Sequence, residues 1–300
     1  MSVPALVLSD SRFPAGGHAH SGGIEPAVAA GTVTDLASLE AFLRGRLRTA
    51  GLVAAGLAAV ACARVGRPWA EVGGDGRWPA GLTMGREDEG RRSARSDGDE
   101  FWELVDAEAD ARTPSPAQRA ASRRQGRALL RAALIAWPDD GALASLAASV
   151  AAASVAAKPA GAAKPAGAAG GGAGRDGAAG SDAADASGHG PRAEYRCGPH
   201  HAVVLGVAAA AAGCEAVDAA RIAVYQSVAG PASAAVRLLA LDPMQATAIL
   251  ARLAGDVDQV AERAAAAAGG PLEELPCPSA PALDLLAEAH IRAEVRLFES

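Results

Sequence analysis

Residues 34–65 have the sequence TDLASLEAFLRGRLRTAGLVAAGLAAVACARV. Leu36, Leu39, Leu43 and Leu47 recur at steps of three and four residues, which places them on one face of an α-helix. The stretch continues without a proline into residues that are almost all apolar. The pattern predicts one helix that runs close to the end of this stretch, and it indicates a helical fold class.

The ends of this helix follow from local signals. Thr34 is the expected N-cap, with Asp35 in the first turn, where a carboxylate stabilises the helix dipole. Gly51 marks a point at which the helix can break. Gly66 and Pro68 follow the last periodic residue, so the helix is expected to end before them.

The composition also favours an all-α fold. Alanine accounts for about 80 of the 300 residues, whereas aromatic residues make up 3%. Alanine is the strongest helix former, and residues that prefer strands are few here. The length suffices for one large helical domain or two small ones. We expect a single multi-helix domain of about ten helices.

Further helices are bounded by capping residues and prolines. Ser115 followed by Pro116, Asp140 and Asp242 each stand where an N-terminus is expected. The expected helices are 24–30, 100–111, 117–136, 141–157, one that starts near Pro199 and ends at Gly213, 215–229, 231–240, 243–268 and an amphipathic 283–298.

A stretch of low complexity separates two helical halves. Residues 158–192 consist almost entirely of Ala, Gly, Ser, Asp and Pro and have little to bury, so we expect a disordered linker rather than a frayed helix. The expected organisation is an N-terminal half over 1–157, this flexible insertion, and 193–300 as the C-terminal half of the same domain. The C-terminal half ends in a tail that we expect to bind a partner.

Charge and composition exclude several classes of protein. A net charge of −6 and a pI of about 5.6 argue against a nucleic-acid partner. No secretory signal opens the chain, and the apolar runs 52–63 and 202–214 are shorter than the ~20 residues of a membrane span. We therefore expect no membrane association. The cysteines, which form no Cys-x-x-Cys pair, fit a reducing cytoplasm: Cys62, Cys197, Cys214 and Cys277.

A glycine-rich loop over residues 11–23 is the segment with the most local information. Its sequence, SRFPAGGHAHSGG, lacks the lysine of a phosphate-binding loop and follows no strand, which argues against nucleotide binding. His18 and His20 form a His-x-His pair that can face one ion on an extended backbone. The alternative is that both make loop hydrogen bonds or interface contacts. The predicted helical fold offers no strand ends to hold further ligands, which favours this alternative.

No other residues form a recognisable catalytic set. His200 and His201 are adjacent at a helix start and diverge too far to share an ion, so one is expected to pack inward and the other to face outward. The chain has no Gly-x-Ser-x-Gly elbow. The sequence therefore favours an interaction protein over an enzyme.

The loop and its flanks, DSRFPAGGHAHSGGIE over residues 10–25, resemble the opening signature of the UreF family of urease accessory proteins. Three collinear stretches support the resemblance: RAASRRQG from 119 to 126, PHHAVVLG from 199 to 206, and AVRLLAL from 235 to 241. The chain departs from the pattern at His18, where many members carry an aromatic residue, and at Asp242-Pro243 in place of Gly-Gln. The charged loop 81–99 and the linker 158–192 look like insertions.

The resemblance implies an all-α homodimer that is not itself an enzyme. It implies a chaperone complex with a UreD/UreH-type protein and the GTPase UreG, which together deliver nickel into apo-urease. Transient nickel contact is conceivable at His18 and His20, with no stably bound cofactor. The alternatives are a metal-dependent hydrolase that uses these two histidines, or a helical adaptor unrelated to urease. The expected partner-binding residues are Gly16, Gly17, His18, His20, Ser21, Gly22, Gly23, Glu25, Leu286, Ile291, Leu297 and Phe298.

The linker is expected to be dispensable for folding. Replacing residues 158–192 with a short Gly-Ser linker should leave the melting temperature within a few degrees, because loop closure costs only about 0.6 kcal/mol per doubling of length. Thermal unfolding followed by circular dichroism measures this. Loss of a cooperative transition would mean that the segment contains a packed element.

Overall fold

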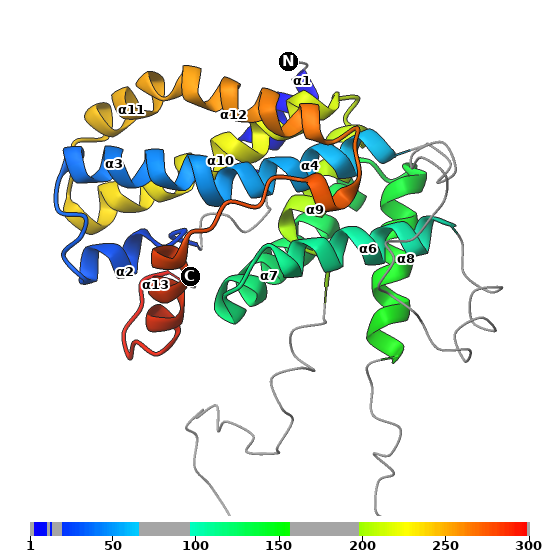
Figure 1. Cartoon of the computed structure of the whole chain (residues 1–300), viewed down its shortest axis with the longest axis horizontal. Helices are drawn as coiled ribbons and strands as arrows, with labels where there is room; N and C mark the ends of the chain where they lie inside the picture. Colours follow the sequence, from blue (N-terminus) through cyan, green and yellow to red (C-terminus); the bar gives the residue numbers. More distant parts are fainter. Residues whose placement is uncertain (1–2, 11–12, 14–19, 66–96, 157–197, 299–300) are drawn as a thin grey trace, which may run out of the picture.

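The computed structural model describes residues 3–10, 13, 20–65, 97–156 and 198–298. Within these ranges every regular element is a helix, which confirms the predicted all-α class (Figure 1). The predicted linker 158–192 lies outside the described residues. The α-helices are α1 (Val3–Ser9), α2 (Ile24–Ala29), α3 (Leu36–Arg46), α4 (Leu52–Arg64), α6 (Asp97–Ala111), α7 (Pro116–Ala136), α8 (Gly141–Ala156), α9 (His201–Ala211), α10 (Ala216–Leu239), α11 (Pro243–Arg252), α12 (Ala254–Ala267) and α13 (Pro281–Ile291).

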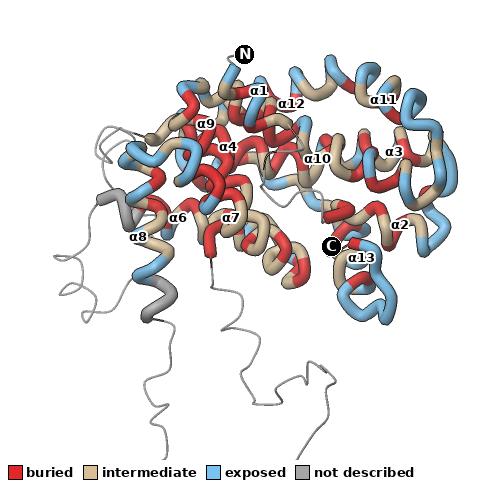
Figure 2. The backbone as a smooth tube through the Cα atoms, turned by 180° about the vertical axis from the view of Figure 1, so that it is seen from behind, coloured by how far each residue is buried: buried red, intermediate tan, exposed pale blue. Residues whose placement is uncertain are grey.

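Helix α4 lies at the centre of the molecule, where it packs against α9, α10 and α12 (Figure 1). Ten of its 13 residues are buried. A helix that is apolar on every side is stable only when it is covered on every side, and α4 meets that condition. Figure 2 shows that the buried parts of the chain gather on α4, α9 and the middle of α10, whereas α11 and α13 present mixed faces to solvent.

The helical run Leu36–Arg64 is also long and apolar enough to cross a membrane by length and composition alone. It is the one such run among the described residues, and 67% of its most apolar window is buried inside the protein. A core helix of a globular protein gives the same signal. The burial of this run against other helices accounts for its apolar character without a membrane.

Glycine and alanine let α4 and α9 approach closely. A Cβ atom placed on Gly206 would lie 2.7 Å from the Cβ of Ala61 and 3.0 Å from the backbone nitrogen of Cys62. Both distances are below van der Waals contact, and the second atom belongs to the backbone and cannot move aside. The abundance of alanine, which contributes little burial energy per residue, therefore serves to bring helix backbones together.

The N-terminus of α3 is capped one residue later than expected. Asp35, and not Thr34, is the N-cap: the backbone N–H of Ser38 donates to Asp35 Oδ1 at 2.8 Å. In return, the backbone N–H of Asp35 donates to Ser38 Oγ at 3.0 Å, which completes a capping box. The expected break at Gly51 takes the form of a π-helical turn, Leu47–Gly51, through which α3 continues into α4.

The other predicted caps are confirmed. Ser115 Oγ accepts from the N–H of Gln118 at 3.2 Å, with Pro116 in the first turn of α7. Asp140 accepts from the N–H of Leu143 at 2.9 Å, and Asp242 accepts from the N–H of Met244 at 2.8 Å. These signals are local, which explains why the sequence shows them.

Two of the predicted boundaries that precede the C-terminal tail are wrong. Helix α10 runs unbroken through Pro231, where two helices were expected. The expected single helix 243–268 is two helices, α11 and α12, which meet at Leu253. Leu253 has 0% exposure and belongs to the core, so the junction of the two helices is buried.

Gly206 should not tolerate a larger residue. Gly206→Val should destabilise the protein by at least about 1–3 kcal/mol, because the new side chain meets the backbone of α4. Gly45→Ala is the matched control, since no heavy atom lies within 4 Å of a Cβ placed on Gly45 in α3, and it should be neutral or stabilising. Urea unfolding of the two variants measures the difference. Equal stability of both would contradict the close approach of α4 and α9.

Candidate functional site

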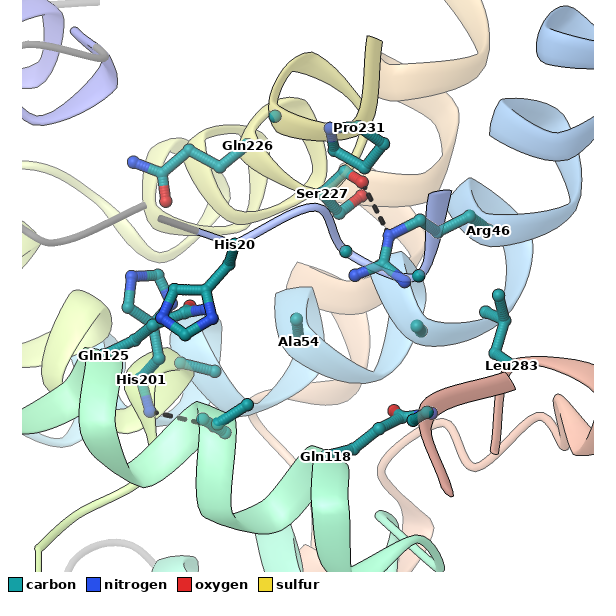
Figure 3. Close-up of a pocket in the computed structure, with 18 of the residues that line it drawn as sticks. His20, Arg46, Ala54, Gln118, Gln125, His201, Gln226, Ser227, Pro231 and Leu283 are labelled. Carbon is teal, nitrogen blue, oxygen red and sulfur yellow. Dashed lines mark hydrogen bonds between the residues drawn. The ribbon is translucent and has the colours of Figure 1, made fainter. Parts of the chain in front are cut away.

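A cavity of about 1650 Å³ opens between α4, α7, α9, α10, α13 and the end of the glycine-rich loop (Figure 3). His20, Gly22 and Gly23 line it from the loop, and Leu283 lines it from α13. Ligand-binding cavities commonly measure ≈ 300–1,000 Å³, so this one can hold a sizeable group. It is the place where the predicted site residues of the loop and of the tail meet.

The described part of the loop packs on the body of its own chain. Gly22 and Gly23 have φ values of +63° and +89°, in the left-handed region that favours glycine. A Cβ on Gly22 would lie 2.8 Å from Pro231 Cγ and 3.3 Å from Arg46 Nη2. Gly22 therefore serves a close approach within the chain, whereas Gly23 supplies only a left-handed backbone angle. Contact of either glycine with a partner stays a prediction. Gly16, Gly17 and His18 lie outside the described residues.

His20 and Ser21 are buried, with 8% and 0% exposure. Ser21 Oγ accepts from the N–H of Glu25 at 3.4 Å, which ties the loop to α2. His20 faces the cavity near His201 (Figure 3). Among the described residues no three His, Cys, Asp or Glu side chains are placed to hold a metal ion. With His18 outside the described residues, nickel contact at this histidine pair stays a prediction.

His201 is neutral at physiological pH. Desolvation, with a smaller contribution from the charge of His20, lowers its pKa from 6.5 to about 4. The side chain reaches the cavity wall from the first turn of α9, beside Gln125 of α7 (Figure 3). The side chains of His201 and Gln125 can donate and accept hydrogen bonds in the cavity without carrying charge.

His200 points into the protein and joins a network that the sequence did not reveal. Its Nε2 lies 2.9 Å from Asp110 Oδ1, and its Nδ1 lies 3.0 Å from Ser122 Oγ. Arg123, which is 4% exposed, pairs with Asp110 at 2.9 Å and with Asp106 at 2.8 Å. Burial would raise the pKa of Asp110, but the bond from His200 and the charge of Arg123 outweigh it and lower that pKa. The one sequence signal was the pair of aspartates four residues apart on α6.

Ser122, His200 and Asp110 are the residue types of a hydrolase triad, yet they serve here to hold helices together. Ser122 Oγ already accepts the backbone N–H of His201 at 3.2 Å, and Asp106 accepts the backbone N–H of His200 at 3.0 Å. The two bonds satisfy the free N–H groups at the start of α9. The network therefore fixes α9 to α6 and α7.

The three described cysteines differ in exposure: Cys62 is buried, Cys214 is half-buried and Cys277 is exposed. Burial raises the pKa of Cys62 to about 12, and its Sγ donates to the backbone oxygen of Cys214 at 3.4 Å. Cys62, Cys214 and Cys277 are all free thiols. Cys197 lies outside the described residues.

The C-terminal tail folds back on its own chain, and its helix is shorter than expected. Helix α13 ends at Ile291 rather than continuing to Phe298, and it packs on α2 and α7. Both carboxylate oxygens of Glu25 accept backbone N–H groups, from Leu297 at 2.7 Å and from Phe298 at 3.0 Å. Phe298 is 8% exposed and lies under Arg237, whose guanidinium carbon is 5.0 Å from the ring centre.

The predicted tail residues thus divide into two groups. Phe298 is a packing residue, and Leu286 is half-buried against the core. Ile291 and Leu297 remain open to solvent, with 48% and 75% exposure. His290 is buried, and its Nε2 donates to the backbone oxygen of Phe298 at 3.2 Å, which adds a second anchor to the tail. A partner can therefore reach Ile291 and Leu297 without unfolding the tail.

The described chain is an all-helical body in which the end of a glycine-rich loop and the C-terminal tail meet at one cavity. This arrangement is that of a helical protein with surfaces for binding partners. The UreF family model matches residues 33–254. A urease accessory protein UreF of Mycolicibacterium vanbaalenii is 38% identical over 295 residues, covering 98% of this chain and 97% of the relative. Proteins of the same name from Mycobacterium bovis and from Mycobacterium sp. strain JLS are each 35% identical over the same shares.

The chain therefore belongs to the UreF family of urease accessory proteins. The resemblance inferred from the glycine-rich loop and the three helical stretches is confirmed. Neither a metal-dependent hydrolase nor a helical adaptor unrelated to urease finds support in these comparisons.

Glu25 should control the order of the tail. Glu25→Gln removes the negative charge and one of the two acceptor oxygens. The backbone amide hydrogens of residues 292–298 should then exchange with solvent at least about tenfold faster, because a charged hydrogen bond is lost. Hydrogen exchange with mass spectrometry measures this, and the melting temperature should change little. Glu294→Gln, in the exposed part of the tail, is the control. Unchanged exchange in Glu25→Gln would mean that other contacts hold the tail.

His201 should make stability depend on pH. Its folded pKa of about 4 lies below the ordinary 6.5, so its contribution is complete above pH 6.5 and is lost as the pH falls toward 4. His201→Gln should therefore show a shallower loss of stability across this window. Urea unfolding at several pH values tests this, with His189→Gln in the linker as the control. Identical pH profiles for wild type and His201→Gln would contradict the burial of this imidazole.

Proposed function

We propose that this chain is a non-catalytic subunit of a cytoplasmic chaperone complex that delivers nickel into the active site of apo-urease. Its partners in this proposal are a UreD/UreH-type protein and the GTPase UreG, and the chain acts as a homodimer. The observation that carries the proposal is the alignment of proteins named urease accessory protein UreF over 98% of this chain. An accessory role requires partners, and the structure offers surfaces suited to them.

The face formed by α13 and the tail supports a docking role. Four large apolar side chains are open to solvent within thirteen residues: Leu285, Ile291, Val295 and Leu297, with exposures of 72%, 48%, 84% and 75%. Exposed apolar side chains that gather in one segment are typical of interaction sites. Because Glu25 and His290 fix the tail, a partner binds this face without the cost of ordering it. We assign the UreD/UreH-type partner to this face.

The hydrogen bonds of the buried histidines support a non-catalytic role, because these side chains already hold parts of the fold together. His200 bonds to Asp110 and Ser122, and His290 bonds to Phe298. Nickel contact, if it occurs on this chain, is then transient and takes place at His18 and His20 in the loop. The chain positions its partners, and the GTPase supplies the energy-consuming step.

The proposal is tested with a paired substitution on the docking face. Ile291→Glu combined with Leu297→Glu should abolish co-elution with the UreD/UreH-type partner. The double variant should also fail to support urease activation in cells that lack their own copy of this protein. Both side chains are exposed, so their replacement leaves the fold intact. Ile135→Glu, at a site on α7 that is 83% exposed, is the control and should behave as wild type.

Size-exclusion chromatography of the purified proteins and urease activity in the cells are the two readouts. If the wild-type chain fails to restore urease activity, the accessory function is wrong. If the double variant still co-elutes with the partner, the assignment of this face is wrong.

A further inference from the structure

The cavity carries a positive bias that the rest of the protein lacks. The chain has a net charge of −6, yet arginines outnumber acidic residues by five to two in the cavity wall. The five are Arg46, Arg112, Arg124, Arg237 and Arg296. A wall of this sign inside an acidic protein favours an anionic occupant, because field lines concentrate in a cleft with low-dielectric walls.

Arg46 is held at the junction of two helical segments by a hydrogen bond to a third. It is the last residue of α3, directly before the π-helical turn, and π-turns often mark functional sites. Its Nε donates to the backbone oxygen of Ser227 at 2.8 Å (Figure 3). That oxygen is available because the residue four positions later in α10 is Pro231, which has no N–H to donate.

The two terminal nitrogens of Arg46 have no partner in the described part of the chain. No carboxylate there forms an ion pair with this guanidinium, and its one hydrogen bond uses Nε. Burial alone lowers the pKa of Arg46 to about 10, with no acidic group to offset the desolvation. The side chain nevertheless stays charged at neutral pH, and a desolvated cation without a counter-ion is costly.

Gly22 leaves room for the guanidinium of Arg46 beside the loop. A side chain at this position would occupy the space against Pro231 and Arg46 Nη2. The loop, the proline within α10 and the π-helical turn thus converge on one cationic group from three separate parts of the sequence. Their common result is a guanidinium that is held at Nε and lines the cavity (Figure 3).

We propose that the cavity binds a carboxylate through the two terminal nitrogens of Arg46. A planar carboxylate matches the guanidinium fork with two parallel hydrogen bonds, and its negative charge offsets the charge of Arg46. The carboxylate has two potential sources: a small free anion, or an acidic side chain of a partner that docks on this face. The second source rests on the proposed function.

The first arm of the test uses acetate as the probe. The melting temperature of the full chain should rise with acetate relative to sodium chloride at equal ionic strength, because a ligand of the folded state stabilises it. Arg48→Gln, at a 65% exposed arginine two residues away, should show the same rise, and Arg46→Gln should show none. Circular dichroism confirms that both variants fold.

The second arm measures affinity for the UreD/UreH-type partner. If the partner supplies the carboxylate, Arg46→Gln should weaken binding at least about tenfold relative to Arg48→Gln, whether or not acetate acts on the free chain. If Arg46→Gln matches wild type in both arms, the carboxylate site is overturned. If the wild-type chain binds no such partner, the proposed function fails, and the acetate arm alone then decides whether the site exists.

Pro231→Ala provides a variant that changes no charge. It supplies an N–H to the carbonyl of Ser227, which competes with Arg46 Nε and loosens the guanidinium. Binding of the carboxylate should weaken, while the helix itself gains stability. Unchanged binding in Pro231→Ala would overturn the role of the Ser227 contact in holding Arg46.

Discussion

The hydrogen bond from Arg46 Nε to the carbonyl oxygen of Ser227 joins the two helical halves of the chain at the cavity. Pro231 leaves this carbonyl without its helical donor, and an unpaired buried carbonyl costs about 1–3 kcal/mol. With the arginine in place, α10 continues through the proline as one helix of 24 residues. The long helix in turn packs against α4, α9 and α12 and meets Gly22 of the loop at Pro231, so this bond supports the helix that lines one side of the cavity.

The rest of the body is held by close contact between backbones rather than by large side chains. Gly206 on α9 lies against Ala61 and the backbone of α4, and these positions admit nothing larger. Each buried alanine contributes little by the hydrophobic effect, but a short distance between helices increases dispersion contacts over the whole interface. A rigid body of this kind suits a protein whose proposed work is to hold partners in fixed positions.

The sequence predicted most features that depend on neighbouring residues, although it placed the N-cap of α3 at Thr34 rather than Asp35, and it missed those that depend on distant residues. Ser115 and Asp140 cap helices through residues three positions away, and both were found from the sequence. Pro231 was taken as a break because its compensating donor, Arg46, is 185 positions earlier. The sequence identified the loop as the candidate site, but it could not show that Glu25 holds the tail. The Glu25 carboxylate accepts hydrogen bonds from backbone N–H groups that lie more than 270 residues later in the chain.

A double-mutant cycle between Arg46 and Pro231 tests the central claim most directly. The free energy of unfolding is measured for wild type, Arg46→Met, Pro231→Ala and the double variant. Arg46→Met should cost about 1–3 kcal/mol in the wild-type background, because the Ser227 carbonyl loses its donor. In the Pro231→Ala background the same change should cost clearly less, since the N–H of Ala at position 231 replaces that donor. Equal costs in the two backgrounds would contradict the dependence of α10 on Arg46.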